Sequence, residues 1–280
     1  PQAASNNMYI RPDGSVDKKA SRSGYSAVGV PGTVAGFALA YKKFGSLPWH
    51  VLVEPAVALA ANGIVVTEFM ANGLERRKES LGRWASTRAV FFRSGMPVRP
   101  GDLLMQKDLA WSLSQIARHG ASSFYNGEIA KRIVRAMREN GGLITAADLA
   151  AYRPVIREPV RGWYRGVEVV SMPPPSSGGI HLIQMLNIIE AYNIRKMGPQ
   201  SAASLHIMIE AMRRAFADRS KYLGDPAFWD VPIKGLISKN YSATWRKGID
   251  PNNETRSADI AHGIPRPHES PDTTHFTIAD

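Results

Sequence analysis

The feature that most constrains this chain is a short strand-like segment at its end, where two threonines follow a polar, proline-rich run. Residues 273–280 alternate roughly between polar and apolar side chains, and their β-branched and aromatic types suit a pleated, half-buried surface. If the peptide bond before Thr273 is cut, that threonine gains a free α-amino group, which can serve as the base for its own hydroxyl. Most Thr-Thr pairs at strand starts are structural, so the rest of the chain has to decide.

Composition is that of a globular protein. A chain of 280 residues with 44% hydrophobic side chains can form one large domain or two small ones. No apolar run reaches the ~18 residues that a membrane span needs, and no signal peptide is visible after Pro1. The absence of cysteine excludes disulfides, thiol catalysis and cysteine-type zinc sites.

The net charge of +11 raises the question of a nucleic-acid or anionic partner. The charge is dispersed, however: residues 76–78 stand beside glutamates, and Arg213 and Arg214 lie within an amphipathic pattern. The sequence has no basic tract of five or more and no RNA-binding signature. We therefore predict a solvated basic surface and no nucleic-acid partner.

Helical spacing dominates the first half of the chain. It predicts helices over 33–44, 49–62, 68–84, 107–119 and 122–140. We expect Thr33 to cap the first helix, and Gly45, Gly63 and Gly141 to end the first, second and last of them. Thr145 is expected to begin a short helix that runs to Tyr152, with Asp148 in a capping-box position.

The pattern changes after Pro154. Residues 158–171 predict a β-hairpin that turns at Arg165-Gly166, and Ser176 or Ser177 opens a helix that runs to about residue 193. A long amphipathic helix is predicted over 201–223, with an apolar face made of Leu205, Met208, Met212 and Phe216. Four prolines among polar residues predict a mobile linker over 251–272.

Two groups of charged residues are candidate sites. His206 and Glu210 lie four residues apart on a predicted helix, a spacing that two metal ligands can have. Without a second histidine the pair favours a surface contact, so we expect no metal. Asp218, Arg219 and Asp225 favour a structural cluster of ion pairs and a turn.

Five segments, in order and at matching spacing, resemble the γ-glutamyltranspeptidase family. They are Gly29–Phe37, Asn140–Thr145 with Asp148-Leu149, Ser171–Gly179, Ala217–Arg219 with Tyr222–Pro226, and the Thr-Thr-His end. The Pro-Pro-Pro-Ser-Ser-Gly-Gly run and the Thr-Thr-His end are highly specific. The resemblance covers nearly the whole chain.

The resemblance implies an α+β fold, the αββα four-layer sandwich of N-terminal-nucleophile hydrolases, of which this chain is an incomplete and mainly helical part. Residues 1–272 would then be a large-subunit portion in which 251–272 form the linker before the cleavage site. Residues 273–280 would begin a small catalytic subunit. The expected assembly is a heterodimer of these two subunits, made from one precursor.

The resemblance also implies an activity. The precursor cuts itself between Asp272 and Thr273, and Thr273 then attacks the γ-glutamyl amide of glutathione or a related small molecule. The resulting ester passes to water or to the amine of an acceptor amino acid or peptide. We expect no cofactor, and the family alone implies a periplasmic or extracellular location.

Neighbouring residues have supporting roles at most. Asp272 stands beside the reacting bond, where its charge can slow or assist the cleavage. His275 faces the same side of the strand as Thr273, but an N-terminal threonine supplies its own base, so a packing or hydrogen-bonding role is favoured. Thr274 faces the other side and is expected to be structural. The loop with Ser176 and Ser177 fits an anion site or a rigid corner, and its lack of charge favours the corner.

Two alternatives remain open. A relative on the same scaffold would cleave glutaryl or cephalosporin side-chain amides, and a non-catalytic member would act as a basic binding module. In the family pattern, the arginine for the substrate carboxylate falls before Pro1 and the oxyanion-hole glycines fall after Asp280. We therefore expect residues 1–280 alone to be inactive.

Overall fold

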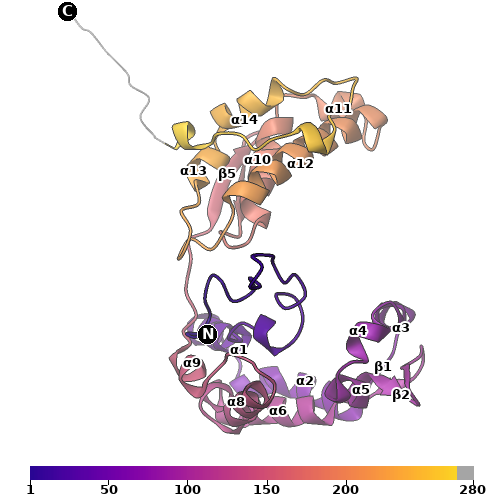
Figure 1. Ribbon diagram of the computed structural model, residues 1–280. Coiled ribbons are helices and arrows are strands. Elements are labelled where there is room, and N and C mark those ends of the chain that lie inside the picture. Colours follow the sequence, from indigo (N-terminus) through magenta and orange to yellow (C-terminus); the bar gives the residue numbers. More distant parts are fainter. Residues whose placement is uncertain (270–280) are drawn as a thin grey trace, which may run out of the picture. The chain divides into compact units, whose positions relative to one another are not determined.

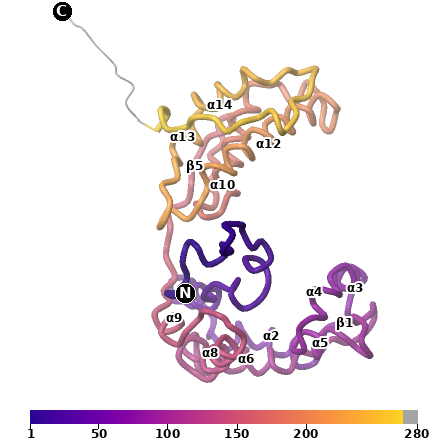
Figure 2. Tube along the Cα trace, in the orientation of Figure 1, coloured from indigo at the N-terminus to yellow at the C-terminus, as the bar shows by residue number. Residues whose placement is uncertain are grey.

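The computed structural model describes residues 1–269, which form two compact units. The first unit covers residues 1–155, and the second begins at Ile156 (Figure 1). The colours of Figure 2 follow the same division, from indigo to magenta in the first unit and on to yellow in the second. No boundary was predicted here, although the sequence pattern changes at Pro154.

The first unit is mostly helical. Its helices are η1 (Tyr25–Ala27), α1 (Thr33–Phe44), α2 (Trp49–Asn62), α3 (Glu68–Glu75), α4 (Lys78–Leu81), α5 (Ala85–Phe91), α6 (Lys107–His119), α7 (Ser122–Tyr125), α8 (Glu128–Glu139) and α9 (Ala146–Ala151). Two small antiparallel sheets accompany them, β1 (Ile64–Val65) with β4 (Leu103–Leu104) and β2 (Phe92–Arg93) with β3 (Met96–Pro97).

The predicted bounds of α1, α2 and α6 are confirmed, but two longer predictions are wrong. The helix expected over 68–84 ends at Glu75 and resumes as the short α4. The helix expected over 122–140 is broken at Gly127, whose extended backbone separates α7 from α8, consistent with the low helix propensity of glycine. Thr33 is the first residue of α1 rather than its cap, and Gly32 occupies the cap position.

The Asn140–Asp148 motif joins α8 to α9. Gly141 has a φ of 70°, and the amide of Gly142 donates to the carbonyl of Met137 at 2.7 Å. The side chain of Thr145 accepts a hydrogen bond from Asp148 N, and Asp148 accepts one from Thr145 N at 2.9 Å. This confirms the predicted glycine stop and capping box.

A tyrosine fastens the Gly29–Phe37 motif to the core of the first unit. The hydroxyl of Tyr125 donates to Pro31 O at 2.8 Å and accepts from Ala35 N at 3.1 Å. Around this ring lies a buried apolar cluster: Tyr125, Ala130, Met137, Ile144 and Leu149. Within the first unit, this motif therefore sets how α1 begins.

The second unit starts with the predicted hairpin. Its elements are β5 (Val160–Tyr164), β6 (Val167–Ser171), α10 (Gly178–Ile189), α11 (Ile194–Met197), α12 (Ala202–Tyr222), α13 (Ile233–Leu236), α14 (Lys239–Arg246), η2 (Ser257–Asp259) and η3 (Arg266–His268). Arg165 and Gly166 have φ of 49° and 83°, as a two-residue hairpin turn requires. The antiparallel pairing of β5 with β6 confirms the prediction.

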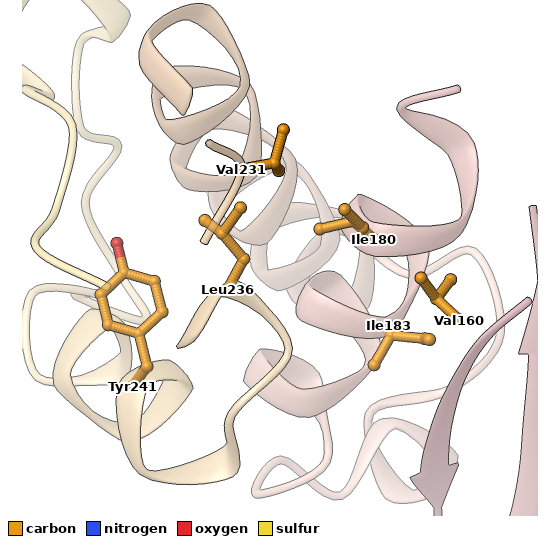
Figure 3. Close-up of a cluster of buried hydrophobic side chains, with 6 residues drawn as sticks. All are labelled: Val160, Ile180, Ile183, Val231, Leu236 and Tyr241. Carbon is orange, nitrogen blue, oxygen red and sulfur yellow. The ribbon is translucent and has the colours of Figure 1, made fainter. Parts of the chain in front are cut away.

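Helix α10 is central to the second unit, where it contacts the hairpin, α12, α13 and α14. Its Ile180 and Ile183 pack with Val160 of β5, and Val231, Leu236 and Tyr241 complete the buried cluster in Figure 3. The ring of Tyr241 belongs to this cluster, but its hydroxyl donates a hydrogen bond to Asp218 at 2.8 Å. The hydroxyl therefore reaches a different environment.

The predicted helix and its apolar face are present in α12, but the second unit does not bury that face. Leu205, Met208, Met212 and Phe216 are 43–53% exposed. The buried face instead carries Ile207 and two alanines, together with three charged side chains: Glu210, Arg214 and Asp218. The apolar spacing identified an apolar face but not the one that the second unit buries.

Among residues 1–269, no helix combines the length and the hydrophobicity needed to cross a bilayer.

A pair of neighbouring glycines tests the packing at the start of α10. A Cβ on Gly179 would lie against Met172 O and 2.6 Å from Val160 Cγ2, whereas a Cβ on Gly178 would meet Ser176 Oγ at an ordinary 3.5 Å. We expect Gly179→Ala to lower the free energy of unfolding by about 1–3 kcal/mol through overpacking. Gly178→Ala, the matched control, should leave it unchanged or raise it by up to about 1 kcal/mol. Urea denaturation of the purified protein measures both, and equal effects would contradict the packing described.

Candidate functional site

The predicted catalytic residues lie beyond the part of the chain that the structure describes. Asp272, Thr273, Thr274 and His275 are all outside residues 1–269. The described chain does include the loop with Ser176 and Ser177, helix α12, and the segment 251–269 that leads to the predicted cleavage bond. These parts form the candidate site.

The proline-rich loop is a tight corner between β6 and α10. Pro174 is buried, Ser176 Oγ accepts a hydrogen bond from Gly178 N at 3.3 Å, and Ser177 takes the cap position of α10 without a capping side-chain bond. These contacts favour the structural reading of the loop. A role for the two serines beside Thr273 stays a prediction.

Glu210 is the first polar centre of the site and is fully buried on α12. Its carboxylate accepts hydrogen bonds from Arg214 at 2.5 Å, from Arg213 at 2.8 Å and from Thr255 N at 3.0 Å. Burial by itself raises the pKa of Glu210, but the hydrogen bonds from Arg214 and Thr255 outweigh it and lower the pKa from 4.5 to about 2. Glu210 is therefore ionised at neutral pH.

Two predictions about this region are wrong. Glu210 is not a surface contact of His206, whose Nε2 lies 2.7 Å from Asp250 O. Arg214 does not belong to a solvated basic surface, because it is only 3% exposed and its guanidinium contacts both Glu210 and Gly248 O. Within residues 1–269, no group of three or more histidine, aspartate or glutamate side chains is placed to hold a metal.

Asp218 is the second polar centre, two turns further along α12, and is also fully buried. Its Oδ2 accepts from Gln184 Nε2 at 2.5 Å, from Tyr241 Oη at 2.8 Å and from Trp245 Nε1 at 3.0 Å. Its Oδ1 accepts from Gly263 N at 2.8 Å. Among the described residues, its hydrogen-bond donors are all uncharged, so a buried carboxylate is satisfied by four neutral groups.

The predicted ion pair and turn are present at Asp225, whose Oδ1 accepts from Ala227 N at 3.0 Å, but Asp218, Arg219 and Asp225 do not form one cluster. The guanidinium of Arg219 lies 5.8 Å from the ring centroid of Phe216, and Asp225 pairs with Arg157 at 3.0 Å. Only Asp218 turns into the interior, because its position on α12 faces α10 and α14.

A short hydrogen-bonded chain extends from Asp218 to a buried histidine. Gln184 donates through Nε2 to Asp218, so its Oε1, which is 2.9 Å from His181 Nδ1, must accept. This assigns a proton to His181 Nδ1. Burial lowers the pKa of His181, which favours the neutral ring. Burial also raises the pKa of Tyr241, with a further contribution from Asp218, so the phenol stays a donor.

The segment 251–269 is irregular, as predicted, but it is tied to the rest of the unit along its length. Thr255 binds Glu210, Gly263 binds Asp218, and Tyr222 Oη donates to Gly263 O at 2.6 Å. Nearer the junction, Arg266 pairs with Asp230 at 2.8 Å. The mobility of the 251–272 linker stays a prediction, and these contacts favour a tethered chain over its described part.

Sequence reasoning missed the residues that satisfy Asp218. Gln184, Tyr241 and Trp245 belong to no motif and lie 23 to 34 positions from Asp218 in the sequence. The sequence of α12 itself contains a pattern that could have identified Asp218 as buried. Charged residues at 210, 214 and 218 recur every fourth position and share a face with Ile207 and with alanines at 211 and 215.

Comparison with known proteins gives concordant matches. A family model described as Gamma-glutamyltranspeptidase matches residues 1–280. A glutathione hydrolase proenzyme of Escherichia coli is 45% identical over all of this chain and 48% of its own length. The Acylase ACY 1 proenzyme of Pseudomonas sp. strain SE83 is 42% identical over 92% of this chain and 45% of its own. The chain spans about half the length of the curated relatives it matches.

A solved structure identifies the fold of this chain. The γ-glutamyltranspeptidase of Helicobacter pylori matches with a TM-score of 0.90 at 42% identity, over 97% of this chain and 78% of that one. The chain shares its α+β, N-terminal-nucleophile hydrolase fold, which confirms the predicted class. Residues 1–269 are mainly helical, as expected of this part.

The low pKa of Glu210 predicts a specific loss of stability in acid. A carboxyl whose pKa is about 2 when folded and near 4.5 when unfolded stabilises the fold above about pH 4.5 and loses that contribution as the pH falls toward 2. The contribution is roughly 3 kcal/mol, since one pKa unit corresponds to about 1.4 kcal/mol. Urea denaturation at a series of pH values measures it.

The variant Glu210→Gln isolates this effect. It leaves Arg214 buried without its anion, so we expect a loss of roughly 3–5 kcal/mol at pH 7 and a flatter acid dependence. Glu168→Gln is the matched control, because Glu168 pairs with Arg161 at the exposed hairpin, where ion pairs contribute little. Parallel acid curves for the wild type and Glu210→Gln would contradict the assignment.

Proposed function

Because this chain belongs to the γ-glutamyltranspeptidase family, we propose that it carries the cleavage junction and the nucleophile of a γ-glutamyl-transferring hydrolase. The nucleophile is Thr273, and the junction is the bond between Asp272 and Thr273. The observation that carries the proposal is the match, 45% identical over the whole chain, to a protein named a glutathione hydrolase proenzyme.

The first reaction is self-cleavage. Thr273 Oγ attacks the carbonyl carbon of Asp272, and the amide nitrogen of Thr273 leaves as an amine after taking up a proton. The product is an ester between Asp272 and Thr273 Oγ. Water then hydrolyses that ester, which separates Asp272 from Thr273 and restores the Thr273 hydroxyl beside the α-amino group that the first step freed.

The second reaction is γ-glutamyl transfer. The free amine of Thr273 takes the proton of the hydroxyl as Oγ attacks the γ-glutamyl amide of a small substrate such as glutathione. The amine portion of the substrate leaves with a proton, and a γ-glutamyl ester remains on Thr273. Water or an acceptor amine then attacks the ester. The proposal requires no cofactor.

The proposed assembly is a heterodimer of the two cleavage products. Residues 1–272 form the large-subunit portion, and Thr273 begins the small catalytic subunit. Exposed apolar side chains on α12, led by Met212 and Phe216, support a second polypeptide packing there. For the location we propose the periplasm or the extracellular space, where a chain without cysteine has no stray thiol to oxidise.

An acylase is the second candidate, because a protein named Acylase ACY 1 proenzyme is 42% identical over 92% of this chain. That activity would use the same threonine on a glutaryl or cephalosporin side-chain amide. A glutaryl group lacks the α-amino group of a γ-glutamyl group, so the two candidates differ in which acyl group they accept. A non-catalytic member remains the alternative if no cleavage occurs.

Intact-mass spectrometry of the full-length protein tests the nucleophile. We expect two fragments that meet between Asp272 and Thr273 in the wild type, and a single chain in Thr273→Ala. Thr274→Ala is the matched control, because it removes the same groups one residue later, and it should still be cut. An uncut wild type, or a cut Thr273→Ala, would contradict the proposal.

The acyl group is tested on the cleaved protein. Release of p-nitroaniline from γ-glutamyl-p-nitroanilide, with much slower release from the glutaryl analogue, is the expected result. The reverse preference would favour the acylase.

A further inference from the structure

Two buried carboxylates on α12 hold the chain that leads to the proposed junction. Glu210 accepts from the amide of Thr255 at 3.0 Å, and Asp218 accepts from the amide of Gly263 at 2.8 Å. The carboxylates are eight residues apart on one helix face, about 12 Å along the axis. The amides of Thr255 and Gly263 are also eight residues apart, so the segment runs alongside α12. An extended chain of that length would be longer than the helix, and the 3-10 turn η2 between the two amides shortens it.

Among the described residues, Asp218 is the last fully buried polar side chain that binds this segment, and residues 265–269 then pack against α13 and Tyr241. After Gly263, the polar contacts are weaker, because Arg266 and Asp230 are 55% and 79% exposed and the contact from Gly235 N to Glu269 is 3.5 Å long. Packing continues there, since Pro265 is buried and the ring of His268 lies 5.5 Å from that of Tyr241. Exposed ion pairs contribute little. The burial of Asp218, and the four hydrogen bonds to it, make it the strongest of these anchors.

The position of this anchor limits how far the chain between Gly263 and Thr273 can move. Ten residues separate Gly263 from Thr273, a reach of at most about 35 Å. If Gly263 were released, residues 265–269 would still contact α13 and Tyr241. Tyr241 is itself held by Asp218, however, so the loss of Asp218 would loosen the segment at both points.

We infer that Asp218 is a positioning residue for self-cleavage: it fixes the chain at Gly263 so that the bond between Asp272 and Thr273 is held in the folded protein where it reacts. The inference rests on the proposed function. Asp218 itself touches none of the reacting atoms. Attack by a hydroxyl on the preceding carbonyl needs a restrained geometry and nearby donors for the oxyanion, and both are lost when the chain is loose.

The hydrogen bonds explain why the anchor is an aspartate. Three donors occupy Oδ2, and Oδ1 is left for Gly263 N. An asparagine accepts at only one atom, so its NH2 group would face either Gly263 N–H or the three donors. Asp218→Asn therefore removes one side of the anchor while keeping the size of the side chain.

The test follows cleavage in full-length precursor freshly refolded from denaturant, with intact mass read against time. We expect the first-order rate constant of Asp218→Asn to fall roughly ten- to a hundredfold. Ile183→Val is the matched control, a mild change in the core beside the β5 hairpin, and should keep the wild-type rate. The folded fraction is measured in parallel by near-ultraviolet circular dichroism.

A second variant covers the case in which Asp218→Asn does not fold. Two glycines inserted between Glu269 and Ser270 leave the hydrogen bonds of Asp218 intact but lengthen the chain beyond the anchor. We expect this insertion to slow cleavage as well. The same insertion at Gly198, in the turn between α11 and α12, should not.

Each outcome decides the inference. A wild-type rate in Asp218→Asn or in the insertion after Glu269 overturns it and leaves the proposed function standing. Equal slowing of Asp218→Asn and Ile183→Val also overturns it, because the rate would then follow stability alone. A wild type that is never cut contradicts the proposed function, and this inference with it.

Discussion

The second unit is organised around the burial of charge on α12. A carboxylate loses several kcal/mol of hydration when it is buried, and it is tolerated only where ion pairs or hydrogen bonds replace the water. Glu210 meets this demand with two arginines, and Asp218 meets it with neutral donors from α10, α14 and the segment after α14. The requirement to satisfy these two groups therefore places three helices and an irregular segment relative to one another within the unit.

This arrangement connects the packing of one helix with the chemistry proposed for the end of the chain. Residues 251–269 contain only two short 3-10 helices, so they have little regular structure of their own to fix their course. Their course is instead fixed by the amides of Thr255 and Gly263, which donate hydrogen bonds to the buried carboxylates of Glu210 and Asp218 on α12. A segment held this way has a defined path toward the proposed junction.

Local signals in the sequence were sufficient for much of the fold. Glycine stops and helical spacing set the bounds of α1 and α2, and Thr145 with Asp148 made the expected capping box. The face of α12 could not be predicted in this way, since apolar periodicity does not show which surface a neighbouring element covers. The proposed junction at Thr273 was predicted from its motif, whereas the environment of Asp218 depends on Gln184 and Tyr241, which only the tertiary structure brings together.

The claim that α12 holds the segment before the junction is tested most directly at single amides. Hydrogen exchange, read by mass spectrometry with residue-level fragmentation in the uncut Thr273→Ala protein, reports on the donors of Thr255 and Gly263. We predict that both amides exchange far more slowly than in an unstructured peptide. Asp218→Asn should speed exchange at Gly263 but not at Thr255, and Glu210→Gln should speed it at Thr255 but not at Gly263. Rapid exchange at both amides with Asp218 and Glu210 intact, or protection of Gly263 that survives Asp218→Asn, would contradict the claim.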